Sequence, residues 1–320
     1  MKSVFLFVLF LSLSTIVHSQ ETIVKTPLST HKTCQLNPKK CLEILPEQLQ
    51  KIPSGSAAWF RLKDYQMWAE YHLAQYEALG ITTNEALNAA NPPGDFEFAS
   101  IIYRAKYLLT VDKDAEAFDL MQRAKKRFAE LDSSSSDPSR LLLYANLIQE
   151  EAHRLKKHAP REVYRAKFLE ARNVLLKVRK NYKNLNDPVF QSNMYANLGH
   201  IASALENYVK FLEYRSRGLF WAKQTKNPLR IATAHYNLAR AYQANRKHKK
   251  AISEYQISVE EHIRARDESG IAICQLRIAQ NHIELGNLKE AKALLSKVSE
   301  SPYKYQYEDL FNELNERLAQ

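Results

Sequence analysis

The stretch that decides the fold is His235-Tyr236-Asn237-Leu238-Ala239, followed by Tyr242, Ala251 and Tyr255. Apolar and aromatic residues recur there at steps of three, four and seven, which place them on one face of a helix. The polar run Asn245-Arg246-Lys247 interrupts this pattern. We therefore expect a hairpin of two helices joined by a short turn.

The same pattern returns with a period of forty residues, in units that begin at Asp187-Pro188, Asn227-Pro228 and Asp267-Glu268. A fourth unit begins at Asp137-Pro138 and is ten residues longer than its successors. One hairpin cannot bury its apolar face alone, so neighbouring units stack and share a continuous core. The sequence therefore predicts an all-α fold, a right-handed α-solenoid whose hairpins curve into a superhelix.

This register resembles the tetratricopeptide repeat family, whose units carry an aromatic residue, a Leu-Gly pair and a Tyr, then an Ala and an aromatic residue. Residues 235–255 follow that pattern most closely, with Leu238-Ala239 at the Leu-Gly position. The resemblance covers residues 137–300 and weakens over residues 56–131, which we expect to form degenerate hairpins. The period of forty exceeds the family's usual 34 residues and implies helices longer by about one turn. The resemblance also implies a concave groove that binds a peptide or protein.

The segments outside the repeats have separate roles. Lys2 supplies a positive start, and residues 4–17 form an apolar run too short for a comfortable membrane span. We expect residues 1–19 to be a cleaved signal peptide, so that the mature chain is periplasmic or secreted by a bacterium and spans no membrane. Residues 20–55 form a leader, and residues 301–320 are expected to form a helix that caps the stack.

The leader holds two cysteines, Cys34 and Cys41, seven residues apart. In an oxidising compartment they can form a local disulfide, because no His or Cys lies near them at a spacing that suits a metal. Cys274 lies on an apolar helical face and is interpreted as a core residue.

The sequence offers little material for catalysis. It has 7 glycines, and the nearest two, Gly80 and Gly94, are fourteen residues apart, so no phosphate-binding loop or nucleophile elbow can be drawn. No His-Glu-x-x-His motif occurs. Glu300-Ser301 matches a catalytic pair of some exported helical enzymes, but it precedes Pro302 directly. We expect no enzymatic activity, no metal and no cofactor.

The family resemblance implies that the central turns of the first helices line the groove. Asn197, Asn237 and Arg277 stand forty residues apart and are expected to form a row. Relatives that grip a carboxylate use Asn and Arg at related places, whereas Asn at this position also bonds locally within the hairpin. The candidate groove residues are Asn193, Asn197, His200, Thr233, Tyr236, Asn237, Arg240, Gln243, Leu276, Arg277 and Gln280.

The chain carries a formal net charge of +11, much of it in one expected hairpin. This basic run is either an anion-binding surface, for an acidic protein or an anionic envelope component, or a solvated helix face. Nucleic acid is not an expected partner of an exported chain without a nucleic-acid module. The run comprises Arg154, Lys156, Lys157, Arg161, Arg165, Lys167, Arg172, Lys177, Arg179, Lys180 and Lys183.

The layout of the chain favours two functions. The repeats predict an exported, non-catalytic interaction module or scaffold that binds a peptide or protein in its groove. Alternatively, a signal peptide, a Cys-containing leader and Trp59-Phe60-Arg61-Leu62-Lys63 opening the hairpins resemble the periplasmic sensory regions of bacterial diguanylate cyclase receptors. That resemblance implies a free-standing ligand-sensing module with a role in signalling.

Overall fold

In a computed structural model of the chain, the structure describes residues 30, 33–34, 37–130 and 138–319. All regular elements within these residues are helices, which confirms the predicted all-α class. The expected signal peptide, residues 1–19, lies outside the described residues. Over the described part of the chain, no helix has the length and apolar character that crossing a membrane requires.

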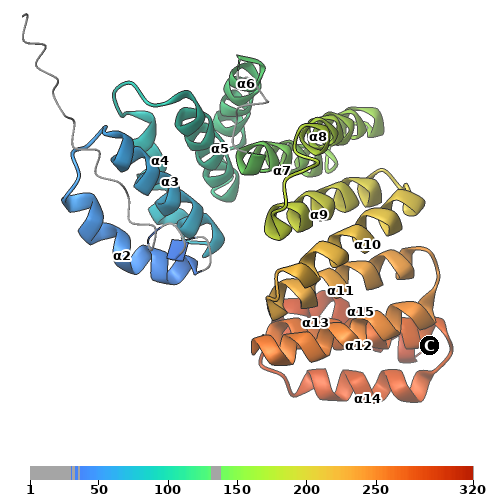
Figure 1. Cartoon of the computed structure of the whole chain (residues 1–320). Coiled ribbons are helices and arrows are strands. Elements are labelled where there is room, and N and C mark those ends of the chain that lie inside the picture. Colours follow the sequence, from blue (N-terminus) through green and yellow to red (C-terminus); the bar gives the residue numbers. More distant parts are fainter. Residues whose placement is uncertain (1–29, 31–32, 35–36, 131–137, 320) are drawn as a thin grey trace, which may run out of the picture.

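Successive helices pair into hairpins that stack along a curved path (Figure 1). Helix α2 precedes them, and η1 with α15 follows. The bounds are α2 (Pro38–Gln50), α3 (Ala57–His72), α4 (Tyr76–Leu87), α5 (Gly94–Thr110), α6 (Asp114–Glu130), α7 (Pro138–Leu155) and α8 (Arg161–Asn181). They continue with α9 (Pro188–Ala204), α10 (Tyr208–Gln224), α11 (Pro228–Ala244), α12 (His248–Ala265), α13 (Glu268–Glu284), α14 (Leu288–Ser299), η1 (Lys304–Tyr307) and α15 (Glu308–Ala319).

The predicted unit starts are N-caps of first helices. The side-chain oxygens of Asp187, Asn227 and Asp267 accept backbone N–H groups of the first turns of α9, α11 and α13. These groups have no partner within the helix, so each cap satisfies a donor that would otherwise need water. Pro188 and Pro228 follow at the first helical position, where a missing N–H costs nothing. The capping residues that recur every forty positions therefore determine where the first helices begin.

The turns inside the hairpins repeat as well. Glu206, Arg246 and Gly286 stand forty residues apart and have φ values of 61°, 57° and 77°. This left-handed conformation is unstrained only for glycine. The turn is therefore imposed at Glu206 and Arg246 by the packing of the flanking helices, while Gly286 adopts it freely.

Small residues let paired helices approach closely. Ala239 of α11 and Ala251 of α12 are fully buried, and Tyr255 fills the space beside them. At the other end, Phe311 and Leu314 of α15 pack on Leu276 and neighbouring residues of the last hairpin. The expected C-terminal cap therefore covers the apolar end of the stack.

The N-terminal end is closed by a covalent bond. Cys34 and Cys41 form a disulfide with a Cα–Cα distance of 4.5 Å. Both cysteines are buried and share a small core with Leu45 of α2 and Leu62 and Ala69 of α3. The leader is thereby anchored to the first hairpin.

Candidate functional site

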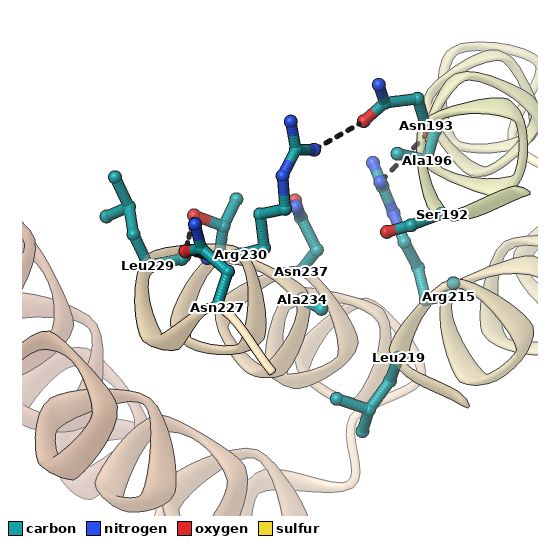
Figure 2. A pocket seen from close by; sticks show the side chains of 12 residues that line it. Ser192, Asn193, Ala196, Arg215, Leu219, Asn227, Leu229, Arg230, Ala234 and Asn237 are labelled. Carbon is teal, nitrogen blue, oxygen red and sulfur yellow. Dashed lines mark hydrogen bonds between the residues drawn. The ribbon is translucent and has the colours of Figure 1, made fainter. Parts of the chain in front are cut away.

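A cavity of about 320 Å³ opens between α9 and α11 above α10 (Figure 2). Its walls come from first helices of successive hairpins, and its floor comes from a second helix. Ser192, Asn193, Ala196, Arg215, Gly218, Leu219, Asn227, Leu229, Arg230, Thr233, Ala234 and Asn237 line it. The two charged residues in this lining are both arginines, so the cavity has a positive character.

Arg215 reaches the cavity from α10 and is buried, with 6% of its surface exposed. Its Nη1 donates to the Ala196 carbonyl oxygen at 3.0 Å, and its guanidinium lies 5.3 Å from the centre of the Phe211 ring. Its Nε is buried without a hydrogen-bond partner. Over the described ranges, no carboxylate forms an ion pair with Arg215. Burial, with a smaller effect of the Arg240 charge, lowers the pKa of Arg215 to about 9, so it stays charged at neutral pH.

Gly199 of α9 makes room for this side chain. A Cβ atom at Gly199 would lie 2.8 Å from Arg215 Nε and 2.9 Å from its Cδ, closer than these atoms can approach. Position 199 corresponds to the Leu-Gly glycine of the predicted repeat. Here the glycine therefore determines where a guanidinium lies as well as how closely two helices pack.

Arg230 supplies the second charge from the first turn of α11. Its Nη1 donates to Asn193 Oδ1 across the cavity at 3.1 Å (Figure 2). Burial lowers the pKa of Arg230, and the charge of Asp187 opposes that effect. The Arg230 charge also acts on His72 of α3. The pKa of His72 is lowered mainly by burial, and the positive charge of Arg230 lowers it further.

A family comparison identifies the architecture around this cavity. Residues 232–260, in α11 and α12, match the model of the tetratricopeptide repeat. The chain contains a tetratricopeptide repeat. The match covers the stretch from which the fold was predicted, and the cavity lies between this repeat and the hairpin before it.

Solved structures extend the repeat fold over most of the chain. A Rap protein complexed with competence and sporulation factor has a TM-score of 0.63 and 11% identity, and the match covers 89% of this chain and 78% of that one. Aspartyl phosphate phosphatase F from Bacillus subtilis has a TM-score of 0.56 and 12% identity, with 90% and 76% covered. At these identities the likeness concerns the fold. No curated protein matches the sequence.

A signal transduction ATPase with numerous domains and a tetratricopeptide repeat sensor, from Pyrococcus horikoshii, is a third match. Its TM-score is 0.62 at 14% identity, with 83% of this chain covered. This chain spans 39% of the length of that protein.

The repeat geometry brings three predicted groove residues to the cavity. Asn193, Thr233 and Asn237 line it together. Asn197 lies outside the lining, because its Nδ2 donates to the Asn193 carbonyl oxygen at 2.9 Å and its Oδ1 accepts from Gln149 at 3.0 Å. The bond to Asn193 is the local one that was the alternative to ligand contact, and the bond to Gln149 joins α9 to α7.

The third member of the expected row, Arg277, belongs to a different network. Its Nη1 donates to Gln280 Oε1 at 2.8 Å, and Gln243 Nε2 donates to the same oxygen at 2.8 Å. Tyr255 donates to Gln243 Oε1 at 3.0 Å, and the Tyr236 and Tyr255 rings lie 5.5 Å apart. Leu276 is buried in the core beneath α15, so it cannot line a groove. Arg277, Gln243 and Gln280 join adjacent hairpins of the repeat stack.

His200 forms a pair that the sequence could not reveal. Its Nε2 lies 2.7 Å from Nε2 of His153 on α7, forty-seven residues away. Burial, and then the neighbouring charges of His153, Arg215 and Arg240, lower the pKa of His200 to about 4. Burial also lowers the pKa of His153. The pair is therefore neutral at pH 7, with one ring donating a hydrogen bond to the other.

The predicted basic surface is partly neutralised by acids from other helices and from the turn after α9. Arg154 Nη1 lies 2.7 Å from Asp114 of α6, Lys167 Nζ lies 2.7 Å from Glu151 of α7, and Arg161 lies 2.5 Å from Glu206. Lys177 lies over the Phe128 ring at 5.8 Å. The other cations that stay exposed are Lys156 and Lys157 before α8, Lys180 in its last turn and Lys183 after it.

Sequence reasoning missed Arg215 and Arg230, because it sought groove residues in the central turns of first helices. A usable signal was present. Arg215 lies four residues after Phe211 and four before Leu219, so a cation occupies the apolar face of α10. The glycine of the Leu-Gly pair in the preceding helix, Gly199, is the second part of this signal, because it leaves room for the Arg215 side chain.

The described residues provide no group of three or more His, Cys, Asp or Glu side chains that could hold a metal. Burial raises the pKa of Cys274 to about 12, and its thiol donates to Ser258 at 3.3 Å. This places Cys274 in the core, as interpreted from the sequence. The absence of enzymatic activity and of a cofactor remains a prediction.

Proposed function

We propose that this protein is an exported, non-catalytic interaction module that binds a peptide or protein segment on the concave side of its repeats. The observation that carries the proposal is the open cavity between α9 and α11, where the polar side chains of Asn193, Thr233 and Asn237 from successive repeats meet. Asparagine amides at such places can hold the backbone of an extended peptide, because each offers a donor and an acceptor. The Rap protein, whose fold is similar, is complexed with competence and sporulation factor, which supports a binding role for this architecture.

Selection from a random peptide library displayed on phage tests this proposal directly. The protein, purified from the periplasm of an expression host, serves as bait. Binders are expected to lose at least about tenfold in affinity, or about 1.4 kcal/mol, on Asn237→Ala. Lys249→Ala, an exposed residue of α12 outside the cavity, is the matched control and should bind normally. Selected peptides that keep wild-type affinity for the double variant Asn237→Ala, Tyr236→Ala would contradict binding at this face.

Export is a separate element of the proposal, and it rests on the charged start and apolar run of residues 1–19. The intact mass of the periplasmic protein is expected to correspond to a chain that begins at Gln20. A mass that retains residues 1–19 would remove the signal peptide and the periplasmic or secreted location from the proposal.

A free-standing periplasmic ligand sensor is the second candidate function. A cavity of about 320 Å³ favours it, because small-molecule sites begin at about this size. The similar fold of a signal transduction protein with a repeat sensor adds support. A metabolite that raises the melting temperature of the wild type but not of Asn237→Ala, with no peptide selected, would favour the sensor over the scaffold.

A further inference from the structure

We propose that the cavity between α9 and α11 is a carboxylate-binding pocket in which Arg215 and Arg230 hold an acidic side chain of the bound peptide. The inference rests on the proposed function and specifies the chemistry of its ligand. It starts from Arg215, a buried cation that lines a cavity and has no acid partner within the described residues.

The energetic argument is that a folded protein tolerates a buried, unneutralised charge poorly. A guanidinium removed from water loses its hydration, and in Arg215 a single carbonyl oxygen and one aromatic face replace it. A carboxylate entering the cavity would supply the missing charge and the planar pair of acceptors that a guanidinium binds best. The ligand therefore compensates a cost that the unliganded protein carries.

The position of Arg215 is fixed before any ligand arrives. The Phe211 ring, the Ala196 carbonyl oxygen and the space at Gly199 hold the guanidinium at the cavity wall. A preorganised cation loses little conformational entropy when it binds. The charge comes from the second helix of a hairpin, so this pocket differs from the row of first-helix residues predicted from the sequence.

The surroundings of Arg215 reinforce the preference for an anion. Arg230 stands on the α11 wall with one N–H bonded to the neutral Asn193 amide. The lining contains no Asp or Glu, and the Arg240 charge acts on Arg215 from outside it. Asp187 acts on Arg230, but its Oδ1 accepts backbone N–H groups of Val189 and Phe190. The net field in the cavity therefore attracts a carboxylate.

The test uses acetyl-Ala-Glu-Ala-amide and its Gln analogue as probes, with the arginine Nε–Hε signals of the protein observed by NMR. The Glu peptide should shift the Arg215 and Arg230 signals to saturation. The Gln peptide, Arg215→Met and Arg230→Gln should each weaken binding at least tenfold. Arg123→Gln, an exposed arginine of α6, removes the same charge elsewhere and should change affinity less than twofold.

Arg215→Met should also leave the melting temperature of the unliganded protein unchanged or higher, since it removes an uncompensated buried charge. Equal affinity for the Glu and Gln peptides would overturn the proposal. So would binding of inorganic phosphate that excludes the Glu peptide, because the pocket would then serve a free anion. If Arg215→Met fails to fold, Arg230→Gln alone decides.

The two proposals fail in different ways. Library-selected peptides that need Asn237 but bind without any carboxylate would leave the interaction module standing and remove the carboxylate pocket. A library that yields no binder at the concave face, with Arg215 still responding to the Glu probe, would remove the interaction module instead.

Discussion

Buried and half-buried cations have different partners in the two halves of the molecule. In α3–α8, Lys63 Nζ lies 2.7 Å from Glu85, Arg140 lies 3.1 Å from Asp64, and Lys106 contacts Glu150 and the Tyr71 hydroxyl. In α9–α13, Arg215, Arg230 and Arg277 bond to carbonyl and amide oxygens. No carboxylate pairs with these three arginines within the described residues.

The difference distinguishes cations that stabilise the fold through an acid partner from cations that are free to bind a ligand. A paired buried cation stabilises its neighbours, and removing one partner is costly. An unpaired one opposes folding, and such local inconsistencies in a folded protein are expected at functional sites. The regular repeats are held instead by small residues such as Ala239 and Ala251, which require no charge to pack. These repeats can therefore hold arginine side chains without an acid partner in their cavity.

The largest expected effect concerns the covalent bond of the N-terminal half. Replacing both Cys34 and Cys41 by Ala should lower stability by about 2–3 kcal/mol, because the disulfide closes a loop across a separation of seven residues. The loss should be concentrated in α2 and α3, where hydrogen exchange should accelerate. The amides of α9–α13 serve as the internal control. Equal acceleration there would contradict the view that the two halves are held by different means.

A matched pair of substitutions tests the contrast between cations. Lys106→Met should destabilise the protein by about 2 kcal/mol, since Lys106 is 1% exposed and its loss leaves Glu150 and the Tyr71 hydroxyl without their partner. Arg215→Met, which also replaces a buried cation by Met, should change stability by no more than about 0.5 kcal/mol or increase it. Urea unfolding followed by circular dichroism measures both.

A cost for Arg215→Met equal to that of Lys106→Met would show that Arg215 is a structural cation. The comparison between the halves, and with it the carboxylate pocket, would then lose its basis.

The histidine pair joins the two halves and predicts a pH dependence. The pKa of His200 in the folded protein is about 4, below its usual value of 6.5, so the folded state favours the neutral ring. The associated stability is complete above pH 6.5 and is lost as the pH falls towards 4. We expect a loss of about 1–2 kcal/mol after solvent screening, measured by urea unfolding at pH 7 and pH 4.5. His200→Gln should reduce this dependence, whereas His158→Gln, an exposed control, should retain it. An unchanged dependence in His200→Gln would assign it to other groups.

Much of the fold was predictable, because the signals that specify it are local. The caps at Asp187, Asn227 and Asp267 and the buried positions around Leu238 follow from helix periodicity and capping chemistry. These patterns act within one or two turns of a helix. Because the units repeat, a correct prediction for one hairpin also holds for its neighbours.

The site was predicted only in part, because its geometry depends on contacts between hairpins. Thr233 and Asn237 were placed by their repeat positions, and both line the cavity. The partner of His200, His153, lies on another hairpin with no periodic relation to it. Arg215 carried a signal on its own helix, but the missing acid partner is visible only in three dimensions.

The substitution with the smallest expected change in stability, Gly199→Ala, moves the Arg215 charge without removing it. It therefore tests whether binding depends on where that charge lies. Gly199→Ala would place a methyl group 2.8 Å from Arg215 Nε, and the flexible side chain should yield before the backbone does. Ala favours the helix by about 1 kcal/mol over Gly, which roughly offsets the displaced guanidinium contacts, so stability should change by less than about 1 kcal/mol. Affinity for acetyl-Ala-Glu-Ala-amide should still fall about tenfold, because the cation no longer lies at the cavity wall. Gly94→Ala is the control, since its Cβ would lie 2.9 Å from Arg127 Nη2 and would displace an arginine outside the cavity while leaving Arg215 in place. If Gly199→Ala binds the Glu peptide as the wild type does while its Arg215 signal moves, the charge acts at a distance and the direct carboxylate contact is wrong.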